Sequence, residues 1–406
     1  MVVLGNVEVN ANQNVLSRKV KGFHINLNIK WCANLPSILD SSSMFQTYNN
    51  AAIVSQLKHA IETKKLHHAN LISSGPGEDG LPLGLTVARL LLCENNTDCG
   101  TCKGCTRVNK LEHPDLTLTF PVVSGGTSGT SDDYIKEFRS ALISNRFLDP
   151  DSWQQQISTK NQQLQIPVKE IQNLQHKLSL TAAEGKNRVL LLWMPEQIKP
   201  VASNKLLKLI EEPLPNTYII LISHRKNRLL PTVLSRCAPW HCRPLSSDSF
   251  NKELSSETSA TAKLLEMVYA PNLGAAITAR QSPEATQIEG FASWMRTCYK
   301  GNPVEITEVV NELSSLPKES LKTLIYRAQH FLERGFYHNV QATEGSATDL
   351  GAINVQKLSN SVLPRGAQTI TSALGSCLRD LERNVHVKTS ITHTSYELHK
   401  AFRGLV

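Results

Sequence analysis

Four cysteines gathered in one short stretch are the clearest chemical signal in the sequence. CENNTDCGTCKGC carries Cys93, Cys99, Cys102 and Cys105 in a C-x5-C-x2-C-x2-C arrangement. Two-residue spacers let backbone turns aim neighbouring thiolates at one ion, and four sulfurs complete a tetrahedral Zn²⁺ shell with no place for water. The cluster predicts a structural zinc site, with an iron–sulfur cluster or four free thiols as alternatives. The remaining cysteines are scattered and are expected to be buried or idle thiols: Cys32, Cys237, Cys242, Cys298 and Cys377.

A glycine turn, GPGEDGLP at 75–82, has the spacing of a phosphate-binding loop but lacks its chemistry. Gly75 and Gly80 are separated by four residues, with Gly77 between them. A working loop continues with a lysine that neutralises phosphate and a hydroxyl residue that holds Mg²⁺. Leu81 and Pro82 stand at those two positions. By itself, the spacing also fits a tight strand-to-helix turn with no nucleotide history.

The second half of a nucleotide site is also incomplete. Such a site needs an apolar strand that ends in acidic residues, one for Mg²⁺ and one to position the attacking water. Here the apolar run 189–192 is followed by Trp193 and Met194, and Glu196 comes two positions too late. Lysine, hydroxyl, metal ligand and base are all missing, so we expect no ATP hydrolysis by this chain and no cofactor bound through the loop.

Apolar periodicity places these motifs on alternating strands and helices. An amphipathic stripe at 50–64 predicts a helix, 68–75 reads as a buried strand entering the glycine turn, and 81–93 as the helix leaving it. Further strands are expected at 189–193 and 217–223, and further helices at 166–178, 201–212 and 227–235. This alternation predicts an α/β fold with a mainly parallel sheet covered on both faces.

Composition divides the rest of the chain. Residues 1–43 lack sustained periodicity and are expected to be either a disordered extension or a mis-called start before Met44. Residues 122–165 are rich in Gly, Ser and Gln, so they are predicted to form an insertion over the surface rather than core. Beyond about 247 the strand signal fades and an all-helical part is expected.

Length and charge set broad limits. A chain of 406 residues suggests two or three domains. The net charge of +8 permits an acidic partner such as nucleic acid, but the Lys and Arg residues form no long run. The apolar runs are far shorter than the roughly 20 residues of a membrane span, and no secretory signal is evident. We therefore expect a cytoplasmic protein without membrane contact and without disulfides.

Several motifs together resemble the AAA+ clamp-loader subunits of bacterial DNA polymerase III. They are SNKLLKLIEEP at 203–213, TYIILIS at 217–223, LLPTVLSRC at 229–237, and the cysteine cluster followed by HPD at 113–115. The resemblance implies an AAA+ P-loop-type domain at 44–246 with a zinc module at 93–105 and an insertion at 122–165. It also implies a helical lid at 247–300 and a helical collar or oligomerisation domain at 301–406. The shorter cysteine spacing and the long insertion mean that the family's loop geometry cannot be carried over to 93–165.

The departures from the family pattern favour one of its branches. The tau/gamma ATPase subunit keeps the lysine and the acids, whereas the delta-prime subunit has a decayed loop and does not hydrolyse ATP. By resemblance, Arg236 within Ser235, Arg236 and Cys237 is an arginine finger supplied in trans to a neighbour's ATP. The alternative is an arginine that pairs with a local carboxylate or contacts solvent. Ser223 and His224 fall at sensor positions, but without an intact site we expect them to be structural.

The resemblance implies a place in DNA replication. A delta-prime subunit is part of the DNA-directed DNA polymerase (nucleotidyltransferase) holoenzyme. It joins tau/gamma and delta subunits and, through the complex, the sliding clamp and primed DNA, within the replisome at the nucleoid. Two other functions stay open at this point. One is an active AAA+ ATPase of tau/gamma type, and the other is a stand-alone zinc-containing DNA-binding protein suggested by the pI of 9.0.

Overall fold

The structure, a computed structural model of the whole chain, forms two compact units. They are Met1–Met44 and Phe45–Val406, and each is described by itself. The residues described are 8–10, 15–20, 23–28, 47–123, 129–158, 162–179, 183–184, 187–257, 268–281, 286–316, 364–383, 385–404 and scattered positions between 262 and 333.

The first unit contains a small antiparallel sheet. Its strands are β1 (Glu8–Asn10), β2 (Val15–Val20) and β3 (Phe23–Asn28), in the order β1-β2-β3. Val15 faces Asn10 on one side and Asn28 on the other. The sequence did not predict these strands, because the segment lacks sustained alternation. The assignment of 1–43 as an extension or a mis-called start stays a prediction.

A five-stranded, all-parallel sheet organises the second unit. The order is β10-β4-β9-β8-β5. The strands are β4 (Ala69–Ser73), β5 (Leu116–Thr119), β8 (Arg188–Trp193), β9 (Thr217–Ser223) and β10 (Ala238–His241). The central strands are continuous apolar runs, as expected for strands buried on both faces. The predicted parallel α/β sheet is confirmed, whereas the edge strands β5 and β10 are too short and too polar to have been recognised.

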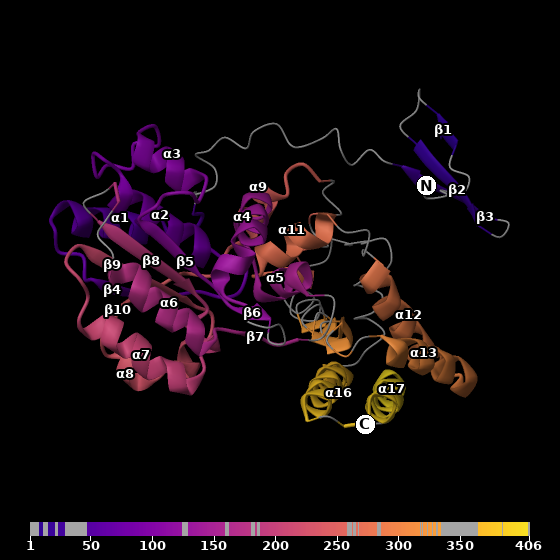
Figure 1. Cartoon of the computed structure of the whole chain (residues 1–406). Helices are drawn as coiled ribbons and strands as arrows, with labels where there is room; N and C mark the ends of the chain where they lie inside the picture. Colours follow the sequence, from indigo (N-terminus) through magenta and orange to yellow (C-terminus); the bar gives the residue numbers. More distant parts are fainter. Residues whose placement is uncertain are drawn as a thin grey trace. The chain divides into compact units, whose positions relative to one another are not determined.

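Helices cover both faces of this sheet (Figure 1). Leu190 and Leu192 of β8 belong to a core shared with α6 and α7, while a Cβ on Gly84 of α2 would touch Leu191 from the opposite face. Alternate residues of one strand therefore pack in opposite directions. The helices are α1 (Ala51–Glu62), α2 (Gly80–Leu92), α6 (Val168–Ser179) and α7 (Pro200–Glu211), all four predicted from periodicity.

The expectation that 122–165 lies over the surface is wrong for the described part of that segment. Phe138 and Trp153 are fully buried, with Phe138 stacked on Phe120 at a centroid distance of 3.9 Å. The indole of Trp153 donates a hydrogen bond of 2.8 Å to the Pro121 carbonyl. Aromatic residues separated by long polar stretches hide this core from a composition-based prediction. The SGGTS tract at 124–128 and residues 159–161 lie outside the described residues.

Short elements complete this segment and the connections around the sheet. They are α3 (Lys103–Asn109), β6 (Val122–Val123), η2 (Ser131–Tyr134), α4 (Ile135–Ser144), α5 (Pro150–Ile157), β7 (Leu164–Gln165), η3 (Pro195–Gln197), η4 (Lys226–Arg228) and α8 (Pro231–Leu234). The helix predicted at 227–235 is thus only the short helix α8, preceded by one 3-10 turn.

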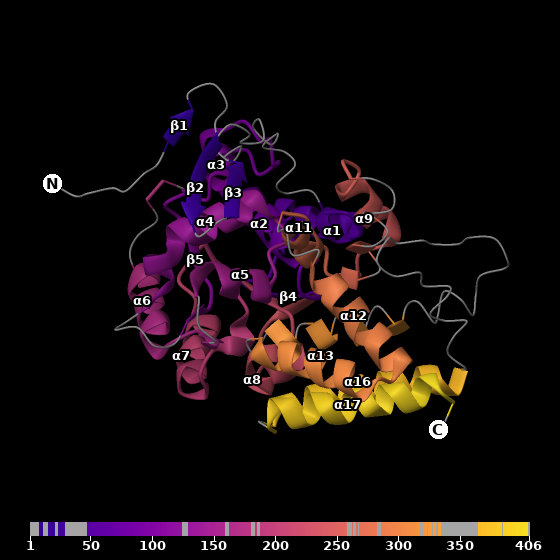
Figure 2. The same cartoon turned by 90° about the vertical axis from the view of Figure 1, so that its right-hand side faces the viewer.

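Every element described after residue 246 is a helix, as predicted. These helices are α9 (Ser247–Glu253), α11 (Leu273–Gln281), α12 (Thr286–Lys300), α13 (Pro303–Ser315), α16 (Pro364–Glu382) and α17 (Val387–Phe402). Helices α16 and α17 lie side by side (Figure 2). One continuous apolar core joins Phe147 to Phe250, Trp294 and Leu398. The division into a lid and a collar therefore remains a prediction.

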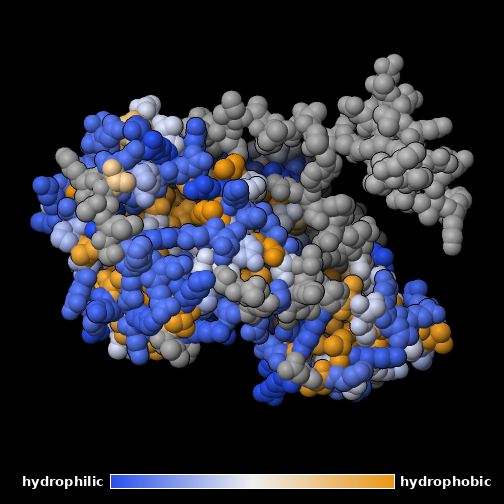
Figure 3. Space-filling model, viewed as in Figure 1, coloured by the Kyte–Doolittle hydropathy of each residue, from blue (hydrophilic) through white to orange (hydrophobic). Residues whose placement is uncertain are grey.

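The surface over the C-terminal helices carries hydrophobic residues. Figure 3 shows hydrophobic atoms gathered in the region of α12 and α13, within a face that is otherwise mostly hydrophilic. The side chains of Tyr299, Val304 and Leu316 are all exposed. Among the described residues, no helix has the length and apolarity that a membrane crossing requires.

Candidate functional site

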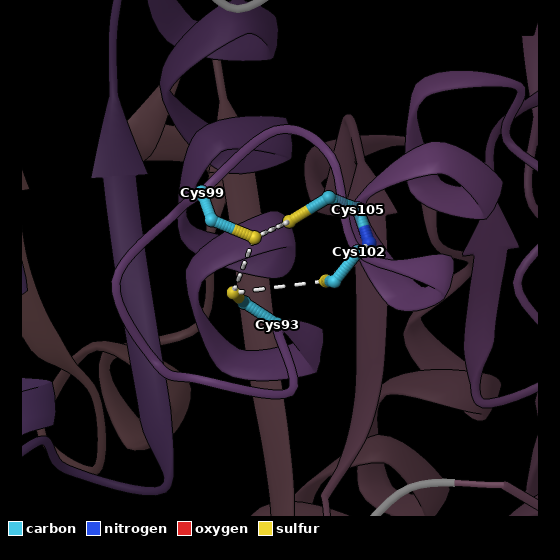
Figure 4. A group of neighbouring side chains, drawn as sticks. All are labelled: Cys93, Cys99, Cys102 and Cys105. Carbon is cyan, nitrogen blue, oxygen red and sulfur yellow. Dashed lines mark hydrogen bonds between the residues drawn. The ribbon is translucent and has the colours of Figure 1, made fainter.

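The four cysteines meet in a single cluster between α2 and α3. All four sulfurs lie within 4.8 Å of one another (Figure 4). Cys93 Sγ is 3.7 Å from Cys99 Sγ and 3.9 Å from Cys102 Sγ, and Cys99 Sγ is 4.0 Å from Cys105 Sγ. Sulfurs around a tetrahedral ion with Zn–S bonds of about 2.3 Å are separated by about 3.8 Å. The donor set and its spacing fit one metal ion.

Local backbone geometry brings the cysteines together. Cys93 ends α2, and Cys102 caps α3, where its sulfur accepts a hydrogen bond of 3.4 Å from the Cys105 amide. The loop between them turns through left-handed residues at Asn96 and Asp98, types that tolerate this conformation. Asp98 also pairs with the Arg89 guanidinium on α2. The loop is thus tied to the helix independently of a metal.

The surroundings of the cluster shift the pKa values of its cysteines in opposite directions. Hydrogen bonds from the backbone of Cys102 and Thr101 lower the pKa of Cys99 to about 6. Burial instead raises the pKa of Cys105. A bound cation offsets that penalty, because metal ligands bind as thiolates. The cluster can therefore hold a metal, and four protein ligands leave no position for catalysis.

The glycine turn forms the expected strand–turn–helix unit. It connects β4 to α2, and Gly77 has a φ of +65°, which glycine adopts without strain. Leu81, at the position of the catalytic lysine, is only 2% exposed and packs in the core, and Pro82 is also buried. The loop keeps its scaffold while the two side chains that would meet a nucleotide are apolar and face inward.

Two acidic residues inside the turn have separate partners. The Glu78 carboxylate accepts a hydrogen bond of 2.9 Å from the Gly75 amide, and burial raises its pKa to about 7. Asp79 accepts hydrogen bonds from the amides of Tyr48 and Asn49 and from the Asn50 side chain, the last at 2.7 Å. Burial raises the pKa of Asp79, and these hydrogen bonds oppose the rise. Asp79 thereby holds the segment before α1 against the loop.

Helix α11 closes over the same turn. The Gly274 amide donates a hydrogen bond of 3.1 Å to the Gly77 carbonyl, and the Asn145 side chain donates one of 2.8 Å to the Gly274 carbonyl. A Cβ on Gly274 would lie 1.7 Å from the Phe147 carbonyl oxygen. The backbone of α11 therefore approaches the loop as closely as glycine permits.

At the strand ends, an aromatic pair stands where acids would be needed. The Trp193 indole donates a hydrogen bond of 2.9 Å to His224 Nε2, and His224 Nδ1 lies 3.2 Å from the Ser74 carbonyl. The ring is therefore neutral, with its proton on Nδ1, and burial lowers its pKa. The Glu196 carboxylate accepts a hydrogen bond of 2.9 Å from the backbone amide of His224, so it is bound to the end of β9. Ser223 Oγ likewise accepts the Arg225 amide.

Arg236 lies apart from this region, just after α8. Its side chain is 40% exposed and pairs with Glu211 of α7 at 2.5 Å. One guanidinium nitrogen also donates to the Thr232 carbonyl and to Ser235 Oγ, at 3.0 Å and 3.3 Å. Cys237 is buried, and burial raises its pKa to about 11. A local carboxylate partner, the alternative considered from sequence, is thus present within the isolated chain.

The structure brings the glycine turn together with Trp193 and His224, while the cysteine cluster and Arg236 lie elsewhere. Sequence reasoning missed the parts played by Glu78 and Asp79. The available signal was their charge, since two adjacent acids inside a phosphate loop oppose a bound phosphate.

Fold and site together define an α/β protein with a parallel sheet and a glycine turn in the strand–turn–helix setting of a phosphate loop, with Leu81 and Pro82 at the positions of the lysine and the hydroxyl residue. The family model described as DNA polymerase III, delta subunit, matches residues 49–246. The resemblance to the clamp-loader delta-prime subunit is confirmed by this match and by relatives named subunit delta'.

Several curated relatives are named DNA polymerase III subunit delta', and one is named subunit tau. The chain is similar to DNA polymerase III subunit delta' of Bacillus subtilis, with 27% identity over 50% of each protein. It is also similar to subunit delta' of Haemophilus influenzae, with 24% identity over 57% of this chain and 59% of the relative. The match therefore spans about half the length of these relatives. A solved gamma-subunit-related protein of Thermotoga maritima superposes with a TM-score of 0.41 and 14% identity, over 86% of this chain and 99% of that one.

Proposed function

We propose that this chain is a non-hydrolysing delta-prime subunit of the DNA polymerase III clamp loader. The observation that carries the proposal is the combination of an exposed Arg236 with a glycine turn in which buried Leu81 takes the place of the phosphate-binding lysine. In this role the chain completes a neighbouring subunit's ATP site while the complex loads the sliding clamp onto primed DNA. It contributes to a DNA polymerase holoenzyme in the cytoplasm without being an ATPase.

The lack of hydrolysis is supported by what fills the site. Buried Leu81 provides no charge for a phosphate, and Pro82 provides no hydroxyl for Mg²⁺. The Trp193 indole is fully buried and hydrogen-bonded to His224, and Glu196 is engaged with the His224 amide. Restoring an attacking water would require rebuilding several contacts at once.

The finger role of Arg236 is supported by its exposure and by its weak local tie. Ion pairs between exposed side chains are worth about 0–1 kcal/mol. Exchanging Glu211 for a neighbour's phosphate oxygens therefore costs little. A guanidinium presents paired donors that match phosphate geometry. One nitrogen of the Arg236 guanidinium is already held by the Thr232 carbonyl and Ser235 Oγ, which limits the motion of the group.

For the cysteine cluster we propose structural zinc. Its four thiolates, separated by 3.7–4.0 Å where they contact, fit a closed tetrahedral shell. The metal would supply folding energy by joining the end of α2 to the start of α3.

As partners we propose the tau/gamma and delta subunits. The exposed Tyr299 and Val304 on the C-terminal helices offer apolar surface that suits packing between helical domains of neighbouring subunits.

The experiment that tests the proposal is ATP turnover by the reconstituted complex. We expect Arg236→Ala to abolish turnover at the site it serves, since fingers supplied by a partner are worth roughly 10³–10⁵ in rate in GTPases. The matched control is Arg228→Ala, an exposed arginine eight residues earlier on the same connection. Unchanged turnover with normal assembly and metal content would refute the finger. Turnover of Mg-ATP by the isolated chain would instead favour an active ATPase.

A further inference from the structure

The glycine turn already contains an acidic side chain, which is ionised above about pH 7. Glu78 is only 5% exposed, and its carboxylate accepts the amide of Gly75 at 2.9 Å. A Cβ on Gly75 would lie 2.7 Å from the Glu78 carboxyl carbon, so the carboxylate rests directly against the start of the loop. In the part of the chain that the structure describes, no lysine or arginine forms an ion pair with Glu78. The backbone and α2 are what hold this charge.

The position of Glu78 is the one that an oxyanion takes in such loops. The turn precedes the thirteen-residue helix α2, whose amino-terminal end carries a partial positive charge. Phosphate loops hold their ligands with backbone amides at this place. A carboxylate hydrogen-bonded to the Gly75 amide satisfies the same donor with the same sign of charge.

A second observation indicates that the glycine turn suits a polar ligand. Ser74 is 8% exposed, and its Oγ is buried without any hydrogen-bond partner among the described residues. This hydroxyl points at the start of α2, where a Cβ on Gly80 would lie 2.1 Å from it. Buried hydroxyls are normally hydrogen-bonded, so an unpaired one here marks a place where an acceptor belongs.

We propose that the loop remains an oxyanion-binding site and that its resident ligand is the chain's own Glu78 carboxylate. The external ligands of this site are phosphate and pyrophosphate groups, which Glu78 excludes by occupying the amide of Gly75. The inference stands apart from the arginine finger, because it concerns only this chain's own loop.

The direct test is pyrophosphate binding by the full chain, measured by titration calorimetry at about pH 8, where Glu78 is ionised. Truncation in Glu78→Ala frees the Gly75 amide and the space beside it. We expect Glu78→Ala to bind pyrophosphate at least about tenfold more tightly than the unchanged protein. An equal or weaker affinity in a folded Glu78→Ala variant would overturn the proposal.

Asp79→Asn is the matched control. It removes a neighbouring negative charge but leaves Glu78 on Gly75, and the asparagine still accepts hydrogen bonds from the segment before α1. We expect a much smaller gain in pyrophosphate affinity for Asp79→Asn than for Glu78→Ala, because Asp79 does not occupy the Gly75 amide. A gain as large as that of Glu78→Ala would mean that charge repulsion alone excludes the ligand, which also overturns the proposal.

A measurement on the unchanged protein covers the case in which Glu78→Ala fails to fold. In a sample labelled with ¹⁵N-glycine, the Gly75 amide resonance should move as Glu78 titrates, with a midpoint near pH 7. The other titratable groups facing the turn are Asp79, Cys242 and His224. Asp79→Asn should lower the midpoint, because the Asp79 charge raises the pKa of Glu78. A Gly75 resonance that does not move between about pH 5 and 9 would refute the contact.

Discussion

At Glu78, a carboxylate with a single hydrogen bond lies in a buried turn. Burial raises its pKa to about 7, while the Gly75 amide lowers it and the Asp79 charge raises it further. The folded state therefore holds a proton that the unfolded chain releases at lower pH. Stability is highest below the unfolded pKa and decreases as the pH rises toward the folded value.

This residue predicts a pH dependence that Glu78→Gln removes. Between about pH 4.5 and 7, the unchanged protein should lose on the order of 1–3 kcal/mol of stability relative to Glu78→Gln, because only the ionised carboxylate is disfavoured by burial. Urea unfolding across this range measures the difference. Glu112→Gln, at an exposed position, serves as the control. Parallel profiles for Glu78→Gln and the unchanged protein would contradict the assignment.

At the scale of elements, the cysteine cluster lies at the junction of α2 and α3, which also contact each other directly: the Arg89 guanidinium on α2 donates a hydrogen bond of 3.1 Å to Asn109 on α3. Cys93 ends α2, while Cys102 and Cys105 begin α3. Arg89 also pairs with Asp98 in the intervening loop, and neither contact of Arg89 involves the cysteine sulfurs. The zinc proposal therefore assigns the metal a structural role at the junction of the helices.

We expect Cys102→Ser to lose the bound metal and at least about 2 kcal/mol of stability, a small part of the roughly 10–16 kcal/mol that zinc contributes to small modules. Metal content by mass spectrometry and the thermal midpoint check both effects. Thr97→Ala, an exposed change in the same loop, should keep the metal. Strong chelators should reproduce the loss in the unchanged protein, and added Zn²⁺ should reverse it. Full metal content in Cys102→Ser would rule out four-cysteine ligation.

At the scale of the whole molecule, the segment between α4 and α5 shares one core with the C-terminal helices. Phe147 belongs to the same apolar cluster as Phe250 and Trp294, and α11 contacts the glycine turn through Gly274. The loop that would open for a nucleotide is thus fixed to the helical part. This coupling agrees with a subunit that acts as a rigid body.

Gly274→Ala tests this coupling. The added methyl group meets the Phe147 carbonyl, so we expect a loss of about 1–3 kcal/mol, the usual cost of overpacking. Gly290→Ala is the control, because nothing lies within 4 Å of the added Cβ on α12, and it should be neutral or stabilising by about 0.5–1 kcal/mol. Denaturant unfolding of both variants measures the contrast. Equal stabilities would mean that α11 does not depend on the close approach.

Prediction from sequence succeeded where a local pattern is sufficient. The runs around Leu190 and Ile220 predicted buried parallel strands, and helical spacing predicted α1, α2, α6 and α7. It failed at 122–165, where Phe138 and Trp153 are brought together across a polar segment. It also failed at β5 and β10, whose short strands are stabilised mainly by pairing with neighbours far away in sequence.

The sequence by itself determined the cysteine spacing, the lack of a lysine and a hydroxyl residue after Gly80, and the lack of acids directly after β8, because each depends only on which residue occupies a position. Only the tertiary structure shows which contacts the residues around the glycine turn make in place of contacts with a nucleotide. The contact of Glu78 with Gly75 depends on the conformation of the turn between β4 and α2, whereas the contacts of Trp193 with His224 and of α11 with Gly77 join separate elements that only the packed fold brings within hydrogen-bonding distance.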